Sequence, residues 1–109
     1  MAESRPTIST HILDVGQGRP AVGVAVRLVR LIGEAPLAVG VGATDDDGRI
    51  GDLLGGAELI EGDYRLEFDV DDDGFFTALA VGFRVSDTSR SYHVPLIRAP
   101  FALSTYRGS

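Results

Sequence analysis

Two histidines are the side chains best suited to acid–base chemistry in this sequence, and one lies near each end of the chain. His11 follows Thr10 in the first stretch of alternating apolar and polar residues. His93 falls within Tyr92-His93-Val94-Pro95-Leu96, on the face opposite the apolar residues, which directs it toward a surface or an interface. A neutral imidazole can take a proton from water near pH 7. A surface or packing role for each histidine remains the alternative.

Arg49 and the last residues of the chain are the other candidates for chemistry. Arg49 follows the hairpin signal Asp47-Gly48. A guanidinium there could clamp a planar anionic heterocycle with two parallel hydrogen bonds, although a solvated arginine is the simpler alternative. Strand-forming residues run almost to the end and are followed by Arg107, Gly108 and Ser109, with its hydroxyl and carboxylate. A structurally idle terminus is usually bland, so this ending indicates a function.

The sequence offers little that would hold a metal ion. It has no cysteine, which excludes a thiolate nucleophile, a disulfide and a cysteine metal site. The histidines have no further ligands at metal-binding spacing. The acidic run Asp69–Gly74 matches the opening of a calcium loop, but the twelfth position, where a glutamate is required, is Ala80. We interpret this run as a solvated turn, and residues 45–47 as a charged hairpin turn.

The segments that must position these groups mostly show the alternation of apolar and polar residues that is typical of β-strands. The alternation is cleanest in residues 64–70, where Tyr64, Leu66 and Phe68 share a face. Short strands separated by glycine-rich and aspartate-rich turns predict an all-β sandwich or barrel, with a weak turn near residues 56–59 as the helix candidate. The predicted strands cover residues 7–15, 24–32, 37–44, 64–70, 79–85, 91–98 and 101–107.

Pro95 interrupts the predicted strand that carries His93. A proline has no N–H to donate to a ladder, so we expect residues 91–98 to form an edge strand or to be bulged at this position. An edge strand is also a place where another subunit can join the sheet.

The bulk composition bounds the possible functions. A chain of 109 residues fits one domain, residues 1–109, with one hydrophobic core. Its net charge of −6 argues against a nucleic acid or an anionic membrane as partner. No apolar stretch approaches membrane-spanning length, and residues 1–5 show no secretory signal, so we expect a cytoplasmic protein.

Five motifs together resemble a known family over nearly the whole chain. They are Ser9-Thr10-His11-Ile12-Leu13-Asp14, Gly18-Arg19-Pro20-Ala21, Asp47-Gly48-Arg49, Tyr92-His93-Val94-Pro95-Leu96 and the ending over residues 104–109. In this order they look like the 5-hydroxyisourate hydrolases, the transthyretin-like enzymes of urate breakdown. The middle of the chain also resembles carboxypeptidase-regulatory-like β-sandwiches, which are non-catalytic. The two histidines and the ending are therefore the specific part of the resemblance.

The resemblance implies a transthyretin-like β-sandwich of two four-stranded antiparallel sheets. It also implies a homotetramer with active sites between dimers, which hydrolyses the small molecule 5-hydroxyisourate to 2-oxo-4-hydroxy-4-carboxy-5-ureidoimidazoline without a metal or organic cofactor. The matching positions are catalytic His11, His93 and Ser109 and substrate-binding Arg49, Arg107 and Gly108. Our hypothesis is that the histidines, hydrogen-bonded to Ser109, deprotonate a water while Arg49 holds the ring.

The sequence departs from the family pattern at two places, and two other functions are left open. The link over residues 71–74 is short where family members carry a helix, so we expect a tight turn. Ala102-Leu103 stands where members tend to carry Gly-Tyr, which bears on interface packing. A small-ligand carrier like vertebrate transthyretin and a non-catalytic accessory sandwich are the alternatives. Neither of them explains the histidines, Arg49 and the ending together.

Overall fold

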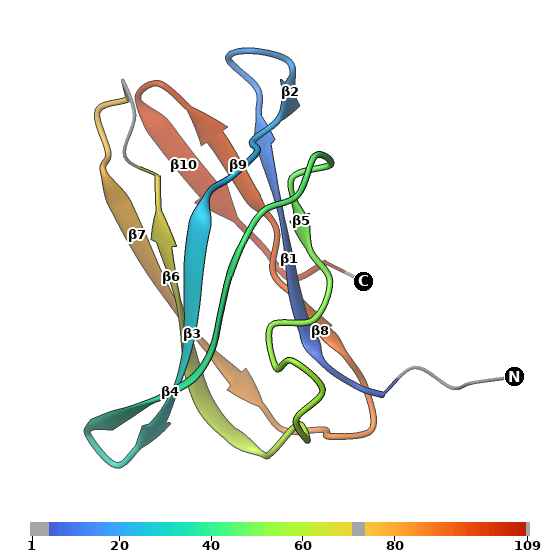
Figure 1. Cartoon of the computed structure of the whole chain (residues 1–109). Helices are drawn as coiled ribbons and strands as arrows, with labels where there is room; N and C mark the ends of the chain where they lie inside the picture. Colours follow the sequence, from blue (N-terminus) through green and yellow to red (C-terminus); the bar gives the residue numbers. More distant parts are fainter. Residues whose placement is uncertain (1–4, 71–73, 109) are drawn as a thin grey trace, which may run out of the picture.

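Two β-sheets pack face to face in the computed structural model, which describes residues 5–70 and 74–108 (Figure 1). The strands in these ranges are β1 Ile8–Asp14, β2 Arg19–Pro20, β3 Ala25–Ile32, β4 Ala35–Ala43, β5 Arg49–Ile50, β6 Gly62–Asp69, β7 Ala78–Val85, β8 Tyr92–His93, β9 Leu96–Ala99 and β10 Ala102–Thr105. No helix occurs in the described ranges, and residues 57–60 are irregular. The predicted β-sandwich with little helix is confirmed there. The turn expected over residues 71–74 lies, Gly74 apart, outside the described residues.

One sheet contains β4, β3, β6 and β7 in that order, and all its neighbours are antiparallel. The alternation that predicted β6 explains its place. Tyr64, Leu66 and Phe68 are at most 2% exposed, whereas Arg65 and Glu67 between them are directed outward. The strand therefore presents an apolar face to the second sheet and a charged face to solvent.

The second sheet is organised around β1. Its main path is β10-β9-β1-β2, and the two-residue strands β5 and β8 also pair with β1. The sandwich of two sheets is as predicted, but this sheet has six strands in the described ranges where four were expected. Because β1 runs parallel to β8 and β9, the expectation of a wholly antiparallel sheet was also wrong for this layer. The chain enters β8 and β9 after β7, which belongs to the other sheet, so no hairpin forces them to run antiparallel to β1.

Pro95 divides the strand predicted over residues 91–98 into β8 and β9. Strand β9 lies between β1 and β10, so the predicted edge position was wrong, whereas an interruption at the proline is observed. Threonine hydroxyls bond the backbone on either side of this break. Thr10 Oγ1 donates to the Val94 carbonyl and Thr105 Oγ1 donates to the Pro95 carbonyl, each at 2.7 Å. These bonds satisfy carbonyls that would otherwise lack a ladder partner.

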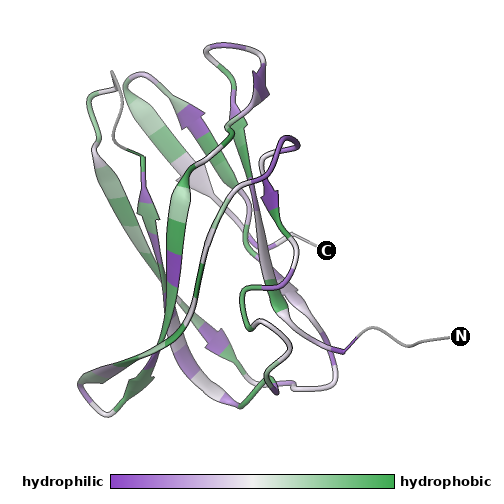
Figure 2. Cartoon of the chain, in the orientation of Figure 1, coloured by the Kyte–Doolittle hydropathy of each residue, from purple (hydrophilic) through white to green (hydrophobic). Residues whose placement is uncertain are grey.

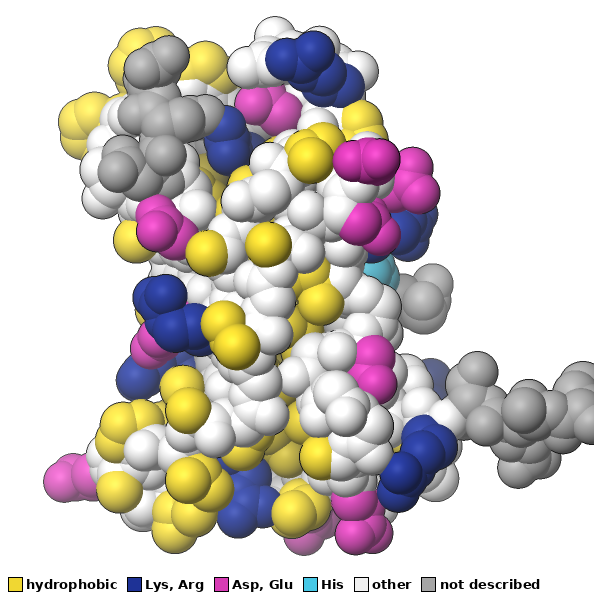
Figure 3. All heavy atoms as spheres, viewed as in Figure 1, with side chains coloured by type: hydrophobic (Ala, Val, Ile, Leu, Met, Phe, Trp, Pro, Cys, Tyr) yellow, Lys and Arg dark blue, Asp and Glu magenta, His cyan; other side chains and the backbone are white. Residues whose placement is uncertain are grey.

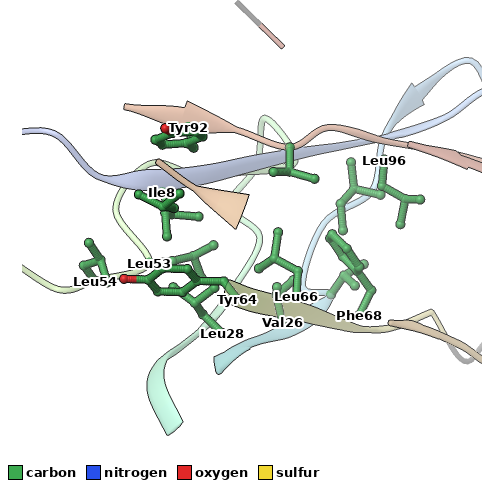
Figure 4. Close-up of a cluster of buried hydrophobic side chains, with 14 of the residues drawn as sticks. Ile8, Val26, Leu28, Leu53, Leu54, Tyr64, Leu66, Phe68, Tyr92 and Leu96 are labelled. Carbon is green, nitrogen blue, oxygen red and sulfur yellow. The ribbon is translucent and has the colours of Figure 1, made fainter. Parts of the chain in front are cut away.

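The core fills the space between the two sheets. Figure 2 shows hydrophobic residues along the strands of both layers, and Figure 4 shows Ile8, Tyr92 and Leu96 on one side facing Leu66 and Phe68 on the other. Ile8, Leu66 and Leu96 are fully buried. Truncating a core leucine of this kind to alanine costs about 2–5 kcal/mol, because the cavity collapses only in part. This packing holds β1 and its partners in a fixed register.

Candidate active site

Alternation along β1 decides which of its side chains can do chemistry. Ile8, Thr10 and Ile12 are buried in the core, so the residues between them, Ser9 and His11, are directed to the outer face of the sheet. Ser9 and His11 therefore lie on the side of β1 that faces away from the core.

The partners of β1 bring two further groups to the same outer face. Arg49 of β5 is paired with His11, and His93 of β8 is paired with Ser9. Side chains paired across neighbouring strands lie on the same face, with the strands about 4.8 Å apart. Two imidazoles, a guanidinium and a hydroxyl from distant parts of the sequence therefore share one patch. In Figure 3 histidine surface is visible beside the acidic and arginine side chains gathered over the turn before β5.

A tight turn fixes Arg49 in this position. Asp45 Oδ1 accepts the backbone N–H groups of Asp47 and Arg49, each at 2.9 Å. The Arg49 N–H bond is the main reason that the pKa of Asp45 lies below its usual value. Gly48 has a φ of 75°, and a Cβ there would come within 2.5 Å of the Ile12 carbonyl oxygen. The charged turn predicted over residues 45–47 is confirmed, but it is not a hairpin, because β4 before it and β5 after it belong to different sheets.

His93 is held from both sides. Its Nδ1 lies 2.8 Å from the Ser9 Oγ. On the other side the Gly108 N–H donates to the His93 carbonyl at 2.8 Å, and a Cβ on Gly108 would come within 2.5 Å of His93 Cδ2. The imidazole edge and the Gly108 backbone are therefore in close contact, which only a glycine permits.

A groove of ≈ 370 Å³ passes over these residues, with Ser9, Arg49, Ser91 and His93 among its lining side chains. Burial lowers the pKa of His93 below 6.5, and the nearby charges of Arg49 and His11 lower it further, whereas a backbone hydrogen bond to Ser9 raises it. His93 is thus neutral at pH 7 and can accept a proton. The arrangement suits activation of a water next to a ligand that Arg49 can hold.

Arg107 takes a different direction from the groove. Its guanidinium carbon lies 4.7 Å from the centre of the Tyr92 ring, in a cation–π contact. The Tyr92 hydroxyl in turn accepts the backbone N–H groups of Ser86 and Asp87. Arg107 therefore attaches the tail to the body of the protein, and it leads into the Gly108 contact with His93.

Comparison with known proteins places the chain among relatives. The family model described as "HIUase/Transthyretin family" matches residues 8–108. The chain belongs to this family. The resemblance recognised from the five motifs is confirmed.

Members of the HIUase/Transthyretin family that resemble this chain come from distant organisms. The 5-hydroxyisourate hydrolase of Deinococcus radiodurans is 41% identical over 115 residues, covering 95% of this chain and 97% of its own. The mouse 5-hydroxyisourate hydrolase is 34% identical over 120 residues and covers all of both chains.

Solved structures support the fold. The Klebsiella pneumoniae 5-hydroxyisourate hydrolase is 36% identical, with a TM-score of 0.81 over 94% of this chain and 99% of its own. Sea bream transthyretin in complex with thyroxine is 26% identical, with a TM-score of 0.85 over 93% of each chain. The transthyretin-like fold is therefore shared by hydrolases and a thyroxine-binding protein, and the site must distinguish them.

Two of the six residues predicted from the sequence, Arg49 and His93, line this groove. His11 and Gly108 adjoin it through strand pairing, His11 with Arg49 and Gly108 with His93. The structure directs Arg107 to Tyr92 instead, and Ser109 lies outside the described residues. The sequence reasoning missed Ser9, although its position two residues before His11 on the same strand face was a usable signal.

Two classes of feature do not occur in the described part of the chain. Residues 5–70 and 74–108 contain no group of three or more histidine, cysteine or carboxylate side chains that could hold a metal ion. None of them forms a helix long and apolar enough to cross a membrane.

Proposed function

We propose that this protein hydrolyses 5-hydroxyisourate to 2-oxo-4-hydroxy-4-carboxy-5-ureidoimidazoline in urate breakdown. The observation that carries the proposal is the strand register, which pairs His11 with Arg49 and brings Arg49 and His93 to one groove. Relatives of nearly the same length that are named 5-hydroxyisourate hydrolase, from bacteria to mouse, support the same conclusion. A small-ligand carrier has no need of two imidazoles and a guanidinium at one site.

The hydrolysis begins with a water held between the two imidazoles. His93 takes one proton from this water as its oxygen forms a bond to the carbonyl carbon of the cyclic amide. The ring C–N bond then breaks, and the leaving nitrogen receives this proton from His93. The second proton of the water leaves the new carboxylic acid for the solvent, so that the product carries a carboxylate. Because the pKa of His93 is lowered, the imidazole is ready to accept the proton at neutral pH. His11 orients the water and relays protons.

Arg49 supplies the positive charge at the site. Its guanidinium can pair with the planar, anionic ring through two parallel hydrogen bonds. It also stabilises the negative charge that develops on the carbonyl oxygen when water adds. The Asp45 turn keeps the Arg49 backbone fixed, so this charge is positioned before the substrate binds.

The tail completes the site in this proposal. Gly108 pairs with His93, which supports a role for the next residue, Ser109, in the hydrogen bonding of the histidines. Arg107 assists through its contact with Tyr92, which holds the tail against β8. The close approach of Gly108 to the His93 ring supports its assignment to the substrate pocket in this proposal.

We further propose that the protein works as a cytoplasmic homotetramer with its active sites between dimers. The groove lies on the outer face of a sheet, where a second copy could cover it and exclude water. Each sheet also ends in a terminal strand, β7 or β10, whose free edge a partner chain could extend. Size-exclusion chromatography with light scattering measures the number of copies, and cell fractionation checks the location.

The decisive experiment mixes the protein with freshly generated 5-hydroxyisourate and follows the ultraviolet decay. We expect decay faster than in a control without protein, and a loss of roughly 10²–10⁴-fold in rate for either His11→Asn or His93→Asn. Both variants should keep the assembly of the parent. A spontaneous rate unchanged by the wild-type protein would indicate a carrier or an accessory domain. Adding residues after Ser109 should also abolish activity if the tail takes part.

A further inference from the structure

The Ser9 hydroxyl makes a direct bond to a proposed catalytic group. Its Oγ lies 2.8 Å from Nδ1 of His93, in a partly buried position. The backbone holds the pair together, because Ser9 and His93 are in register across the parallel strands and the Val94 N–H donates to the Ser9 carbonyl at 3.0 Å. The contact is therefore built by the sheet and does not depend on two mobile side chains meeting.

We propose that Ser9 is a positioning residue, whose oxygen accepts the Nδ1–H of His93 and leaves the Nε2 lone pair available to a water in the groove. The proposal rests on the proposed hydrolysis for its catalytic consequence, whereas the state of the imidazole can be measured without any substrate.

The chemistry requires such a partner. A neutral imidazole has one N–H and one lone pair, and a hydrogen bond at one nitrogen decides which atom carries the proton. A free histidine in water favours the form with the proton on Nε2, which would present a donor to the groove instead of a base. In the serine protease triad an aspartate at Nδ1 selects the reactive form. A serine hydroxyl can accept as well as donate, so Ser9 makes the same selection, without adding a charge, when its own O–H is directed away from the ring.

The charges around His93 agree with a neutral partner. Arg49 faces it from β5 and His11 faces it from β1, and Arg107 lies over the neighbouring Tyr92. Burial first, and then the neighbouring Arg49 and His11, favour the neutral imidazole, whereas a carboxylate at Nδ1 would favour the charged one. In the proposed arrangement Ser9 accepts the Nδ1–H, while His93 stays ready to accept a second proton at Nε2.

Gly108 restricts the imidazole from the opposite edge. The close approach of the Gly108 backbone to Cδ2 leaves the Nδ1 edge of the ring on the Ser9 side. Turning the ring over would exchange Nδ1 with Cδ2 and lose the bond to Ser9. In the described part of the chain no hydrogen bond engages Nε2, so this nitrogen is the one that can serve a water.

The imidazole form can be read directly by ¹⁵N–¹H NMR of the full-length protein labelled at histidine. In a His11→Gln background His93 is the remaining histidine, so its two ring nitrogens are assigned without ambiguity. We expect the Nδ1–H form with Ser9 present, a shift toward the Nε2–H form in Ser9→Ala, and the Nδ1–H form again in Ser9→Thr. A predominantly Nε2–H ring in the Ser9 parent, or a ratio unchanged by Ser9→Ala, would overturn the proposal.

Kinetic measurements on the protein that retains His11 test the effect of Ser9 on catalysis. Ser9→Ala should lower kcat roughly tenfold with KM within about twofold, because ground-state binding does not depend on which nitrogen carries the proton. Ser9→Thr should restore most of kcat, and Ser89→Ala, the same change in an exposed turn, should behave as the parent. A raised KM with unchanged kcat would assign Ser9 to substrate binding and overturn the positioning role. If the wild-type protein does not accelerate decay, the proposed hydrolysis fails, while the NMR result still decides the role of Ser9.

Discussion

Gly108→Ala tests whether the tail sets the position of the His93 ring. The added Cβ would lie 2.5 Å from Cδ2 and 3.2 Å from Cγ of His93, and 3.3 Å from Cγ of Pro95. An ordinary contact begins at 3.4 Å, so the ring or the tail must move by about 1 Å. The Pro95 ring is rigid and stands on the same side, so the movement falls on the imidazole or detaches the tail.

The expected effect is on catalysis more than on stability. A displacement of about 1 Å at a reacting group can cost roughly 10²-fold in rate, so we expect kcat of Gly108→Ala to fall by about this factor. The melting temperature should change little, because Gly108 lies near the end of the chain and outside the core. The assay is the ultraviolet decay of 5-hydroxyisourate, with circular dichroism to follow unfolding.

Gly82→Ala is the matched control. Its new Cβ would have the Tyr64 carbonyl oxygen at 3.9 Å as its neighbour, which is an ordinary contact, so this variant should keep the parent kcat. A Gly108→Ala protein that folds and turns over as fast as the parent would refute the idea that the tail positions His93.

Three further predictions concern Arg49, the turn before it and the neighbouring His93. Gly48→Ala forces a side chain into a left-handed backbone and toward a carbonyl, so the free energy of unfolding should fall by roughly 1–3 kcal/mol in a denaturant titration, with a raised KM as Arg49 moves. Because the pKa of His93 in the folded protein lies below 6.5, the acid limb of the kcat/KM profile should also lie below 6.5. The free energy of unfolding should decline as the pH falls through 6.5, because His93 takes up its proton in the unfolded chain before it does so in the folded protein. Arg49→Gln removes one cause of this shift, so the His93 pKa should rise in an NMR titration, and an unchanged value would contradict the assignment.

The long strands could be predicted from the sequence because their cause is local. In β6 an apolar residue at every second position, Tyr64, Leu66 and Phe68, both identifies the strand and fixes its buried face. The two-residue strands β5 and β8 are too short to show any period. They exist because β1 offers them partners, and that information lies more than thirty residues away in the chain. The direction of β9 relative to β1 is non-local in the same way.

The residues of the site could be predicted from the sequence, but the contacts between them could not. His11, His93 and Arg49 stand out by residue type, and the resemblance to a family supports them. The bond from Ser9 to His93 spans 84 positions and follows only from the parallel register. Arg107 is charged and near the end, which suggests a ligand, yet its contact with Tyr92 depends on the path of the chain after β10. Residue type indicates the chemistry, and strand pairing decides which atoms face one another.

The register of β1 determines both the packing of the core and the geometry of the site. Side chains alternate between faces, so a slip of one residue would turn Ser9 and His11 into the core and expose the neighbouring isoleucines. Such a slip would bury an imidazole without a partner and lose the apolar area of Ile8 and Ile12, which makes the alternative costly. The same apolar packing that stabilises the sandwich therefore also selects the pairing of His11 with Arg49 and of Ser9 with His93. A core substitution that preserves this register should lower stability while leaving the geometry of the groove intact.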